Sequence, residues 1–343
     1  MGESLKKKLR VGVIGCGRIS VMHLGSIAML GEELVAVCDT KRERAEEAAK
    51  KYGGAIYTDY IEMLEREKLD AVHLCLPHYV HCKVAEAAIE RGVAVLSEKP
   101  MDVSYEAAEH ATLLAKERGV IFGIVSQCRY NNSAVLVKNA LTSGKLGKII
   151  SARSILTWKR DNEYYLESDW KGTWEKEGGG VVIDQAIHSI DLVNWMIDSK
   201  VVSLSANLSK RSAKVCEVED TAEGLIEYEN GAVYGFYCMN NYAVDEPIEI
   251  ILQCEKGKAV FGYDDAKITY NDGTIEEAHQ DFYAEYNGGA DYWGLQHVRQ
   301  IRQFYAAVRG DEPLDISAEE ALKTHKIIMQ IYKIGKPEGG FLS

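Results

Sequence analysis

Two short segments of the chain combine residue types that can take a proton from a hydroxyl group. The first is Glu98-Lys99-Pro100, where a lysine that ends an apolar run can hydrogen-bond a substrate hydroxyl and favour loss of its proton. The second is the pair Asp184 and His188, which follows a cluster of three glycines at 178–180. The pair is spaced four residues apart, so both share one face of a helix expected over 181–197. A histidine titrates near neutral pH and suits a general base, while the aspartate can orient or charge-stabilise the imidazole or the substrate.

Each segment also has a plainer explanation. Lys99 is equally consistent with an exposed lysine in a surface turn, and pairs such as Asp184 and His188 are common on helix surfaces. Apolar residues flank that pair, however, and a largely buried helix that carries Asp and His needs partners or a purpose for them. Pro100 fixes the backbone after the lysine, and the Lys99–Pro100 bond is a candidate for the cis form.

A glycine-rich turn near the N-terminus predicts a dinucleotide site. Gly15 allows a sharp turn after the first apolar run, and Gly17, which lacks a Cβ, lets the backbone approach a pyrophosphate. A helix expected from Ile19 would point its N-terminal amides at the phosphates. Ser20 stands where a third glycine is usual and is small enough for close helix–strand packing. Asp39 ends the second apolar run and can accept hydrogen bonds from an adenosine ribose, which favours NAD over NADP.

Alternating strands and helices are expected to position these residues. The expected strands are 9–14, 34–39, 71–76, 93–97 and 120–126, and the expected helices are 19–30, 42–52, 80–91 and 105–118. Such alternation with short connections predicts a parallel sheet with helices on both faces. Ligands of such sheets bind at the carboxyl ends of the strands, so Gly15, Asp39, Leu76-Pro77 and Glu98-Lys99 are expected to converge on one cofactor site.

After about residue 125 the pattern changes to that of an α+β domain. A helix is expected at 133–141, a strand at 149–158, an aromatic loop at 159–180, strands at 201–209, 221–228, 232–240, 248–254 and 258–263, and helices at 292–309 and 318–334. Residues 229–231 and 255–257 are hairpin-turn candidates. The fold class is therefore α/β, with an N-terminal Rossmann domain over 1–124 and a C-terminal α+β domain over 125–343 built on a large, mostly antiparallel open sheet. The open face of that sheet is a candidate oligomer interface.

Composition limits the classes of partner. The 343-residue chain carries a formal net charge of −12, which would repel nucleic acid, and no apolar run approaches the length of a membrane span. Its eight cysteines form no CxxC pair and are expected to be reduced and buried in a cytoplasmic protein. His78, His81 and Cys82 lie close together, but their spacing matches no common zinc pattern, so no metal is expected.

In combination, these motifs resemble the glucose–fructose oxidoreductase / inositol dehydrogenase / rhizopine catabolism (Gfo/Idh/MocA) family. The residues that carry the resemblance are Gly15, Gly17, Ser20, Asp39, Pro77, His81, Glu98-Lys99-Pro100, Asp184 and His188. It spans nearly the whole chain, and it implies NAD(P)-dependent oxidation of a sugar or cyclitol hydroxyl. It also implies dimers or tetramers packed through the open sheet.

The resemblance assigns roles to individual residues. Lys99 and His188 match the catalytic lysine and histidine of the family, and Asp184 matches the assisting acid. The positions implied to contact the cofactor are Gly15, Gly17, Arg18, Ile19, Asp39, Leu76, Pro77, His81, Glu98, Lys99, Gln127 and Arg129.

The aromatic segment 164–175 narrows the expected substrate. It resembles family members that act on pyranosides or nucleotide sugars, including sugar 3-dehydrogenases. Aromatic faces pack on the C–H surfaces of sugars, while cationic and hydroxyl side chains bind hydroxyls or carboxylates. The expected substrate residues are Lys99, Arg160, Tyr165, Trp170, Thr173, Asp184 and His188, and a purely structural aromatic loop is the alternative for this segment.

Three functions remain open from the sequence. The leading one is NAD-dependent oxidation of a secondary hydroxyl of a sugar, sugar derivative or cyclitol. The second is a redox-neutral glycosidase that keeps NAD bound. The third is a non-enzymatic NAD-binding regulator, against which the joint presence of Lys99, Asp184 and His188 argues.

Overall fold

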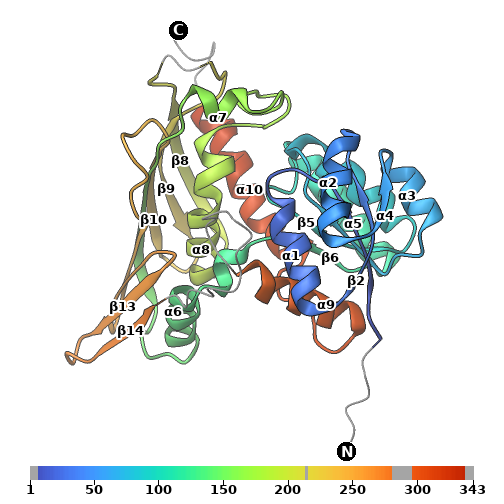
Figure 1. Cartoon of the computed structure of the whole chain (residues 1–343). Helices are drawn as coiled ribbons and strands as arrows, with labels where there is room; N and C mark the ends of the chain where they lie inside the picture. The colour runs from blue at the N-terminus through green and yellow to red at the C-terminus, as the bar shows by residue number, and fades with distance from the viewer. Residues whose placement is uncertain (1–6, 213–214, 280–295, 337–343) are drawn as a thin grey trace, which may run out of the picture. The chain divides into compact units, whose positions relative to one another are not determined.

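Six parallel strands in the order β3-β2-β1-β4-β5-β6 form the sheet of the first compact unit (Figure 1). The structure is a computed structural model that describes residues 7–212, 215–279 and 296–336. The elements of this part are β1 (Arg10–Ile14), α1 (Ser20–Leu30), β2 (Glu33–Cys38), α2 (Arg42–Tyr52), β3 (Ala55–Tyr57), α3 (Tyr60–Arg66), β4 (Ala71–Leu74), α4 (His81–Ile89), β5 (Ala94–Ser97), α5 (Tyr105–Arg118) and β6 (Phe122–Ile124). The strand order reverses between β1 and β4, which is where dinucleotides bind on such sheets.

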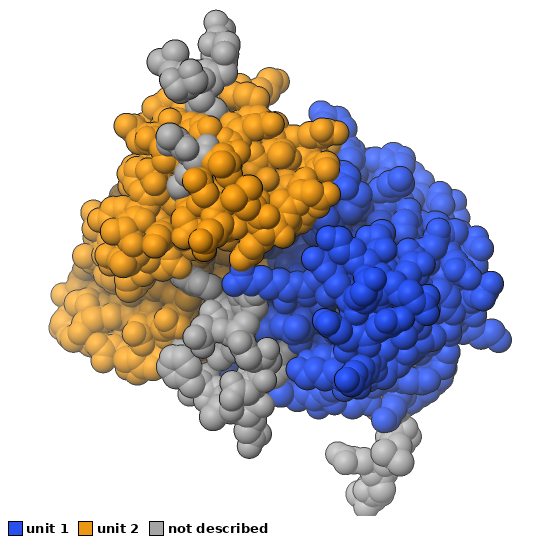
Figure 2. All heavy atoms as spheres, turned by 45° about the horizontal axis from the view of Figure 1, so that its top comes forward, with its two compact units in different colours: residues 1–102, 106–125, 283–322 blue, residues 103–105, 126–282, 323–343 orange. Residues whose placement is uncertain are grey.

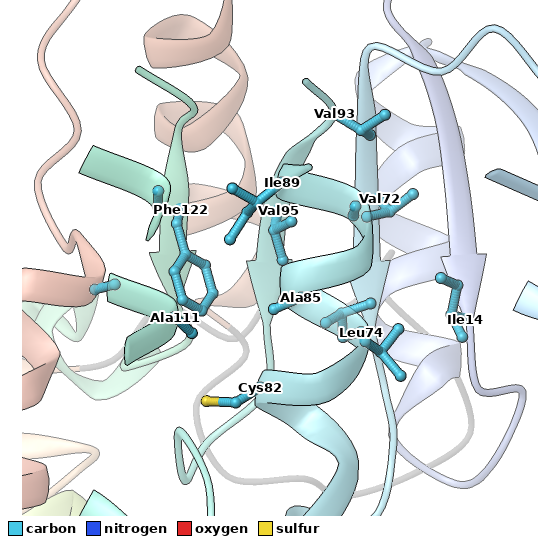
Figure 3. Packing of buried hydrophobic residues seen from close by; sticks show 14 of the residues in the cluster. Ile14, Val72, Leu74, Cys82, Ala85, Ile89, Val93, Val95, Ala111 and Phe122 are labelled. Atoms are coloured by element: carbon cyan, nitrogen blue, oxygen red, sulfur yellow. The ribbon is translucent and has the colours of Figure 1, made fainter. Parts of the chain in front are cut away.

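Two apolar cores cover the two faces of this sheet. On one face, side chains of β4, β5 and β6 pack against α4 and α5, as Figure 3 shows for Val72, Val95 and Phe122 beside Ala85 and Ile89. On the other face, β1 and β2 pack with α1, α2 and α9 (His297–Arg309). The sheet is therefore sandwiched between helices, as the alternation of elements predicts.

The helix α9 belongs to the first unit although it lies near the end of the chain. Figure 2 colours the two units: the first takes in the residues up to 102, 106–125 and the stretch that ends at 322, and the second takes in the rest. The expected division placed all residues after 124 in the second domain. The structure differs because Ile301, Phe304 and Tyr305 are buried in the apolar core on the α1 side of the first sheet. Residues 292–295 of the expected helix lie outside the described residues.

The second unit is built on an eight-stranded sheet of order β14-β13-β12-β11-β7-β10-β9-β8 (Figure 1). Its neighbouring strands are antiparallel except for the parallel pair β7 and β10. The elements are α6 (Asn132–Thr142), β7 (Ile149–Thr157), α7 (Asn162–Leu166), α8 (Ile187–Ile197), β8 (Val201–Ser209), β9 (Thr221–Tyr228), β10 (Val233–Met239), β11 (Glu249–Cys254), β12 (Gly257–Phe261), β13 (Asp265–Tyr270) and β14 (Ile275–His279), with α10 (Ala318–Gly335) closing the described chain.

Most expected elements are present, and the differences are short or local. Both expected hairpins form, β9 with β10 and β11 with β12. The sequence did not predict β3, α3, α7 or the hairpin of β13 and β14, because segments this short carry too few turns of periodicity. All eight cysteines have free thiols, and seven of them are buried. None of the helices described in the structure is both long enough and apolar enough to cross a membrane.

Candidate functional site

The turn between β1 and α1 has the steric features of a phosphate-binding loop. Gly15 has a φ of 92°, and a Cβ there would lie 2.2 Å from the carbonyl oxygen of Cys75. At Gly17 no atom lies within 4 Å of the place a Cβ would occupy, so packing among the described residues does not require a glycine. That open space suits a bound phosphate. The buried Ser20 donates its hydroxyl to the Gly17 carbonyl at 2.6 Å and ties the turn to the start of α1.

Asp39 follows β2 and is fixed beside that turn. Its two carboxylate oxygens accept the backbone N–H groups of Cys16, at 2.9 Å, and Lys41, at 2.8 Å. Each oxygen keeps a further lone pair for a ribose hydroxyl. The N-terminus of α1 has no side-chain cap from Ile19 and no acidic residue in its first turn, and Arg18 is exposed beside it. These residues fit the pyrophosphate and adenosine ribose of a dinucleotide.

His81 connects two segments at the carboxyl edge of the first sheet. Its Nδ1 lies 2.7 Å from the carbonyl oxygen of Pro100, and its Nε2 lies 2.8 Å from that of Leu76. Burial lowers the pKa of His81, against the two backbone hydrogen bonds that raise it. Leu76 and Pro77 are half-buried at this edge, and the Lys99–Pro100 bond is cis. Because backbone carbonyls occupy both ring nitrogens, His81 is placed to brace the cofactor edge.

Glu98, directly after β5, is buried in a hydrogen-bonded cluster. Its Oε1 lies 3.0 Å from Nε2 of His23 on α1 and 3.2 Å from Nε2 of His297 on α9. Its Oε2 accepts the backbone N–H of Lys99 at 3.2 Å. Burial alone would raise the pKa of Glu98, but the hydrogen bonds from His23 and His297 hold it well below its usual range. A carboxylate is thus kept ionised in the interior, next to the half-buried Lys99.

The side chains of His23, Glu98 and His297 are also the group of potential metal ligands that the described residues bring together, with ligand atoms within 4.8 Å of one another. The same atoms form the hydrogen bonds of Glu98 with His23 and His297 given above, so we interpret the group as a hydrogen-bonded cluster. Two residues that the sequence analysis considered as metal ligands have protein partners: His81 faces two carbonyls, and the Cys82 thiol donates to Met101 O at 3.3 Å.

In the second unit, the glycine cluster lets the backbone pass close to the Tyr332 side chain and to the backbone of Glu219. A Cβ on Gly179 would lie 2.0 Å from the Tyr332 hydroxyl, and a Cβ on Gly180 would lie 2.0 Å from the Glu219 carbonyl oxygen. Both distances are far shorter than any van der Waals contact. The close approach that the sequence predicts for this cluster is therefore present.

Glu219 and Tyr332 take the hydrogen bonds of the first amides in the helix that follows. Glu219 accepts from the N–H groups of Gly180, at 2.9 Å, and Val182, at 3.1 Å. The Tyr332 hydroxyl accepts from Ile183 N–H at 3.1 Å and donates to Glu219 at 2.8 Å. These bonds satisfy amides that have no partner inside the helix. Residues Val182–Ala186 form a π-helical turn before α8, where the sequence predicted a helix from 181.

Asp184 and His188 are the two half-buried residues in the otherwise buried stretch 181–190. Asp184 lies on the π-helical turn, and its Oδ2 accepts hydrogen bonds from the Tyr164 hydroxyl and from Gln185 Nε2, both at 2.5 Å. The carboxylate is therefore fixed in orientation. The sequence predicted a largely buried helix in which Asp and His need partners or a purpose, and Asp184 has such partners in Tyr164 and Gln185.

Tyr164 is a residue of this site that sequence reasoning did not select. Its ring lies 3.6 Å, centroid to Nζ, from Lys171 and 5.3 Å from the guanidinium carbon of Arg160. Burial, with the charge of Asp184, raises the pKa of Tyr164 well above its usual value, so its hydroxyl stays protonated and donates. The signal was present as a tyrosine pair at 164–165, but sequence alone gave no reason to prefer the first tyrosine.

The other residues expected in the sugar site, Tyr165, Thr173, Trp170 and Arg160, have contacts within the second unit. Tyr165 is buried in a small apolar core. The Thr173 hydroxyl donates to the carbonyl of the half-buried Trp170 at 2.9 Å. Arg160 pairs with Asp245 at 3.1 Å. Among these, Trp170 is the half-buried aromatic that suits a sugar face.

Two residues expected near the cofactor follow β6 in sequence. Arg129 is buried and forms a bidentate pair with Asp191 at 2.7 and 2.6 Å, which gives it a structural role. The Gln127 Oε1 atom is buried with no hydrogen-bond partner among the described residues. A buried acceptor without a partner is costly, so this atom suits the N–H of a ligand.

Comparisons with known proteins identify the family of the chain. Residues 9–126 match the model of an oxidoreductase family with an NAD-binding Rossmann fold, and residues 135–260 match the GFO/IDH/MocA C-terminal domain. The chain is 26% identical to D-glucoside 3-dehydrogenase of Escherichia coli K12, with 95% of each chain covered. It is 28% identical to 1,5-anhydro-D-fructose reductase of Ensifer adhaerens, covering 66% of this chain and 68% of the relative.

A solved structure supports the fold over the same length. The WlbA dehydrogenase of Bordetella pertussis, in complex with NADH and UDP-GlcNAcA, superposes with a TM-score of 0.82 at 28% identity, with 95% of this chain and 96% of that chain covered. The expectations of a Rossmann unit, an NAD cofactor and an oxidoreductase of the sugar and cyclitol dehydrogenase type are confirmed. The chain belongs to the Gfo/Idh/MocA family of NAD-binding oxidoreductases.

Proposed function

We propose that this enzyme oxidises a secondary hydroxyl of a sugar or sugar glycoside, with Lys99, Asp184 and His188 handling the hydroxyl proton. The observation that carries the proposal is the placement of Asp184 and His188 as the two half-buried residues on a buried stretch of helix. A proton-handling pair at such a place has reach to a ligand and shielding from bulk water.

His188 takes the hydroxyl proton in this proposal, and Lys99 hydrogen-bonds the same oxygen and favours its ionisation. Asp184 is oriented by the Tyr164 hydroxyl, and it stabilises the protonated imidazole of His188 or orients the substrate. Bound NAD supplies the hydride acceptor. Gly15, Gly17 and Asp39 would hold the cofactor, and Gln127 offers a buried acceptor for one of its N–H groups or for the substrate.

For the substrate we propose the 3-hydroxyl of a glucoside-like pyranoside. The E. coli relative named for that reaction matches this chain over 95% of both lengths. The cationic groups of Lys171 and Arg160, which flank the Tyr164 ring, also suit a carboxylate or phosphate on the sugar. A nucleotide sugar is therefore the second substrate class to test.

The test is a screen of glycosides, cyclitols and nucleotide sugars with NAD, following NADH absorbance and product mass. The proposal expects NADH in equal amount to a ketone product. Cleavage of a glycosidic bond without net NADH would instead identify the redox-neutral glycosidase. NAD binding without turnover of any compound would favour a regulator.

We also propose that the chain forms homodimers or homotetramers through the open face of its large sheet. Ile155, Leu225 and Tyr237 are exposed on three neighbouring strands and line one groove. Two copies that meet face to face would bury the same apolar patch twice.

The free cysteines support a reducing compartment, and we propose the cytoplasm.

A further inference from the structure

The buried hydrogen-bonded cluster around Glu98 includes residues beyond its direct partners His23, His297 and Lys99. Beyond Glu98, Nδ1 of His23 lies 2.9 Å from Nδ1 of His73, and Nε2 of His73 lies 3.0 Å from the Tyr305 hydroxyl. The five residues of this cluster, counting His297, are each at most 6% exposed. They come from α1, β4, the end of β5 and α9, so four elements of the first unit converge on one carboxylate.

The hydrogen bonds of this cluster have one consistent direction. An ionised Glu98 only accepts, so His23 donates to it from Nε2. A neutral His23 then accepts at Nδ1 from His73, whose Nε2 accepts from the Tyr305 hydroxyl. Burial lowers the pKa of His23 and lowers that of His73 well below its usual value, so both rings are uncharged near neutral pH. Every donor points toward Glu98, which is the acidic group of the cluster.

The carboxylate stands at a particular place on the sheet. A dinucleotide with its adenosine ribose at Asp39, after β2, would cross the switch point between β1 and β4, and its nicotinamide end would then lie toward the ends of β4 and β5. Glu98 and Lys99 follow β5 directly. The oxidised nicotinamide ring carries a positive charge and the reduced ring carries none. A fixed negative charge on that side therefore acts on one redox form of the cofactor.

We propose that Glu98, kept ionised by His23 and His297, is an electrostatic element that makes the protein bind NAD⁺ more tightly relative to NADH. This goes beyond the proposed sugar chemistry and does not depend on which sugar is the substrate. The neighbouring amine of Lys99 opposes it when protonated, so the two side chains set the balance together. A buried charge is effective because little water screens it.

The test is the ratio of dissociation constants, Kd for NAD⁺ over Kd for NADH, measured by fluorescence or calorimetric titration without any sugar. Glu98→Gln keeps the shape and removes the charge, and it should raise the ratio roughly 3- to 20-fold. Lys99→Met removes a positive charge and should lower the ratio. A purely structural role for Glu98 would weaken both cofactor forms alike and leave the ratio unchanged.

The matched control is Tyr305→Phe, which removes one buried hydrogen bond of the same cluster without changing its charge. Its ratio should stay at the wild-type value. If Glu98→Gln does not fold, the double variant Glu98→Met with His23→Leu removes both partners of the bond and serves in its place. A ratio unchanged on neutralising Glu98, or shifted in the same direction by Lys99→Met, overturns the proposal.

Discussion

The Tyr164 hydroxyl helps to fix the Asp184 carboxylate in the candidate active site. Tyr164 donates to Asp184 at 2.5 Å, and the amide of Gln185 reaches the same oxygen. Hydrogen bonds to charged groups are stronger than neutral ones, so their loss is expected to release the carboxylate. Tyr164 is therefore a positioning residue, acting through Asp184.

Removing the Tyr164 hydroxyl should slow turnover and leave the binding of NAD unchanged. Tyr164→Phe loses one hydrogen bond to a charged group, which is worth about 1.5–3 kcal/mol, so we expect kcat to fall about tenfold or more. The Kd for NAD should be unchanged. Tyr57→Phe, which breaks a tyrosine–carboxylate bond to Glu67 in the first unit, is the control and should keep its kcat. Equal kcat for the Tyr164 variant and the wild type would remove Tyr164 from the site.

We expect the cofactor preference to depend on Asp39. Its carboxylate accepts the backbone N–H of Cys16 in the dinucleotide turn and that of Lys41 after β2, and a negative charge there would repel a 2′-phosphate. Asp39→Ser should weaken the binding of NAD, because the turn loses its hydrogen bond to the carboxylate. It should also shift kcat/KM in favour of NADP. Steady-state kinetics with both cofactors check this. A wild-type kcat/KM for NADP equal to or above that for NAD would contradict the assignment.

Some residues of the candidate site could be selected from the sequence and others could not. Gly15, Asp39, Lys99, Asp184 and His188 were identifiable because local spacing encodes a turn, a strand end or a helix face. The partners of Glu98 were not, since His297 lies 199 residues away and no local pattern links the two. For the same reason sequence gave no cause to prefer Tyr164 over Tyr165.

At the scale of elements, the entry to α8 is the least ordinary structure in the second unit. Glu219 and Tyr332 cap its first amides, and the glycine cluster makes room for both. The sequence predicted the helix and its glycine start. It did not predict the π-helical turn or the partners of its first amides, because Glu219, just before β9, and Tyr332 on α10 lie far along the chain from this turn.

The buried Glu219 should make stability depend on pH. Burial raises its pKa to about 7, against the hydrogen bonds from Val182, Tyr332 and Gly180 that lower it. The folded state therefore binds this proton more tightly than the unfolded state. Its contribution to stability is full below the unfolded pKa near 4.5 and is lost as pH rises toward about 7.

Urea unfolding between pH 5 and 8 tests this. The free energy of unfolding of the wild type should contain a component that falls with rising pH, by about 1.4 kcal/mol per unit of pKa difference. Glu219→Gln should be less stable at low pH, because its amide cannot accept from all three donors, and should lack that component. An identical pH slope in the two proteins would show that Glu219 does not titrate in this range.

For the whole molecule, the return of α9 to the first unit means that neither unit is one continuous piece of sequence. Ile301, Phe304 and Tyr305 complete the core on one face of the Rossmann sheet. The sequence could place an amphipathic helix there but could not say which sheet it covers, since the same apolar stripe suits either. Truncation of the chain at the expected boundary would remove this helix from the first core.

Assembly is the second property at this scale. A charge placed on the open sheet should separate copies of the chain without unfolding it, because Leu225 is 43% exposed. Leu225→Arg should give a monomer by light scattering, whereas the wild type gives a dimer or tetramer. Leu113→Arg, on a leucine of α5 that is 53% exposed, is the control. A monomeric wild type, or an unchanged oligomer in the Leu225 variant, would rule out this face.

The central claim, oxidation of a sugar hydroxyl by NAD with His188 as the base, is tested most directly by measuring NADH and product together in the wild type and in His188→Ala. The account predicts one NADH for each product molecule that is two hydrogen atoms lighter than the substrate. It predicts that His188→Ala lowers kcat by roughly 10²–10⁴-fold with the Kd for NAD retained. Product formed without NADH, or a His188→Ala enzyme with most of its kcat, would contradict the account.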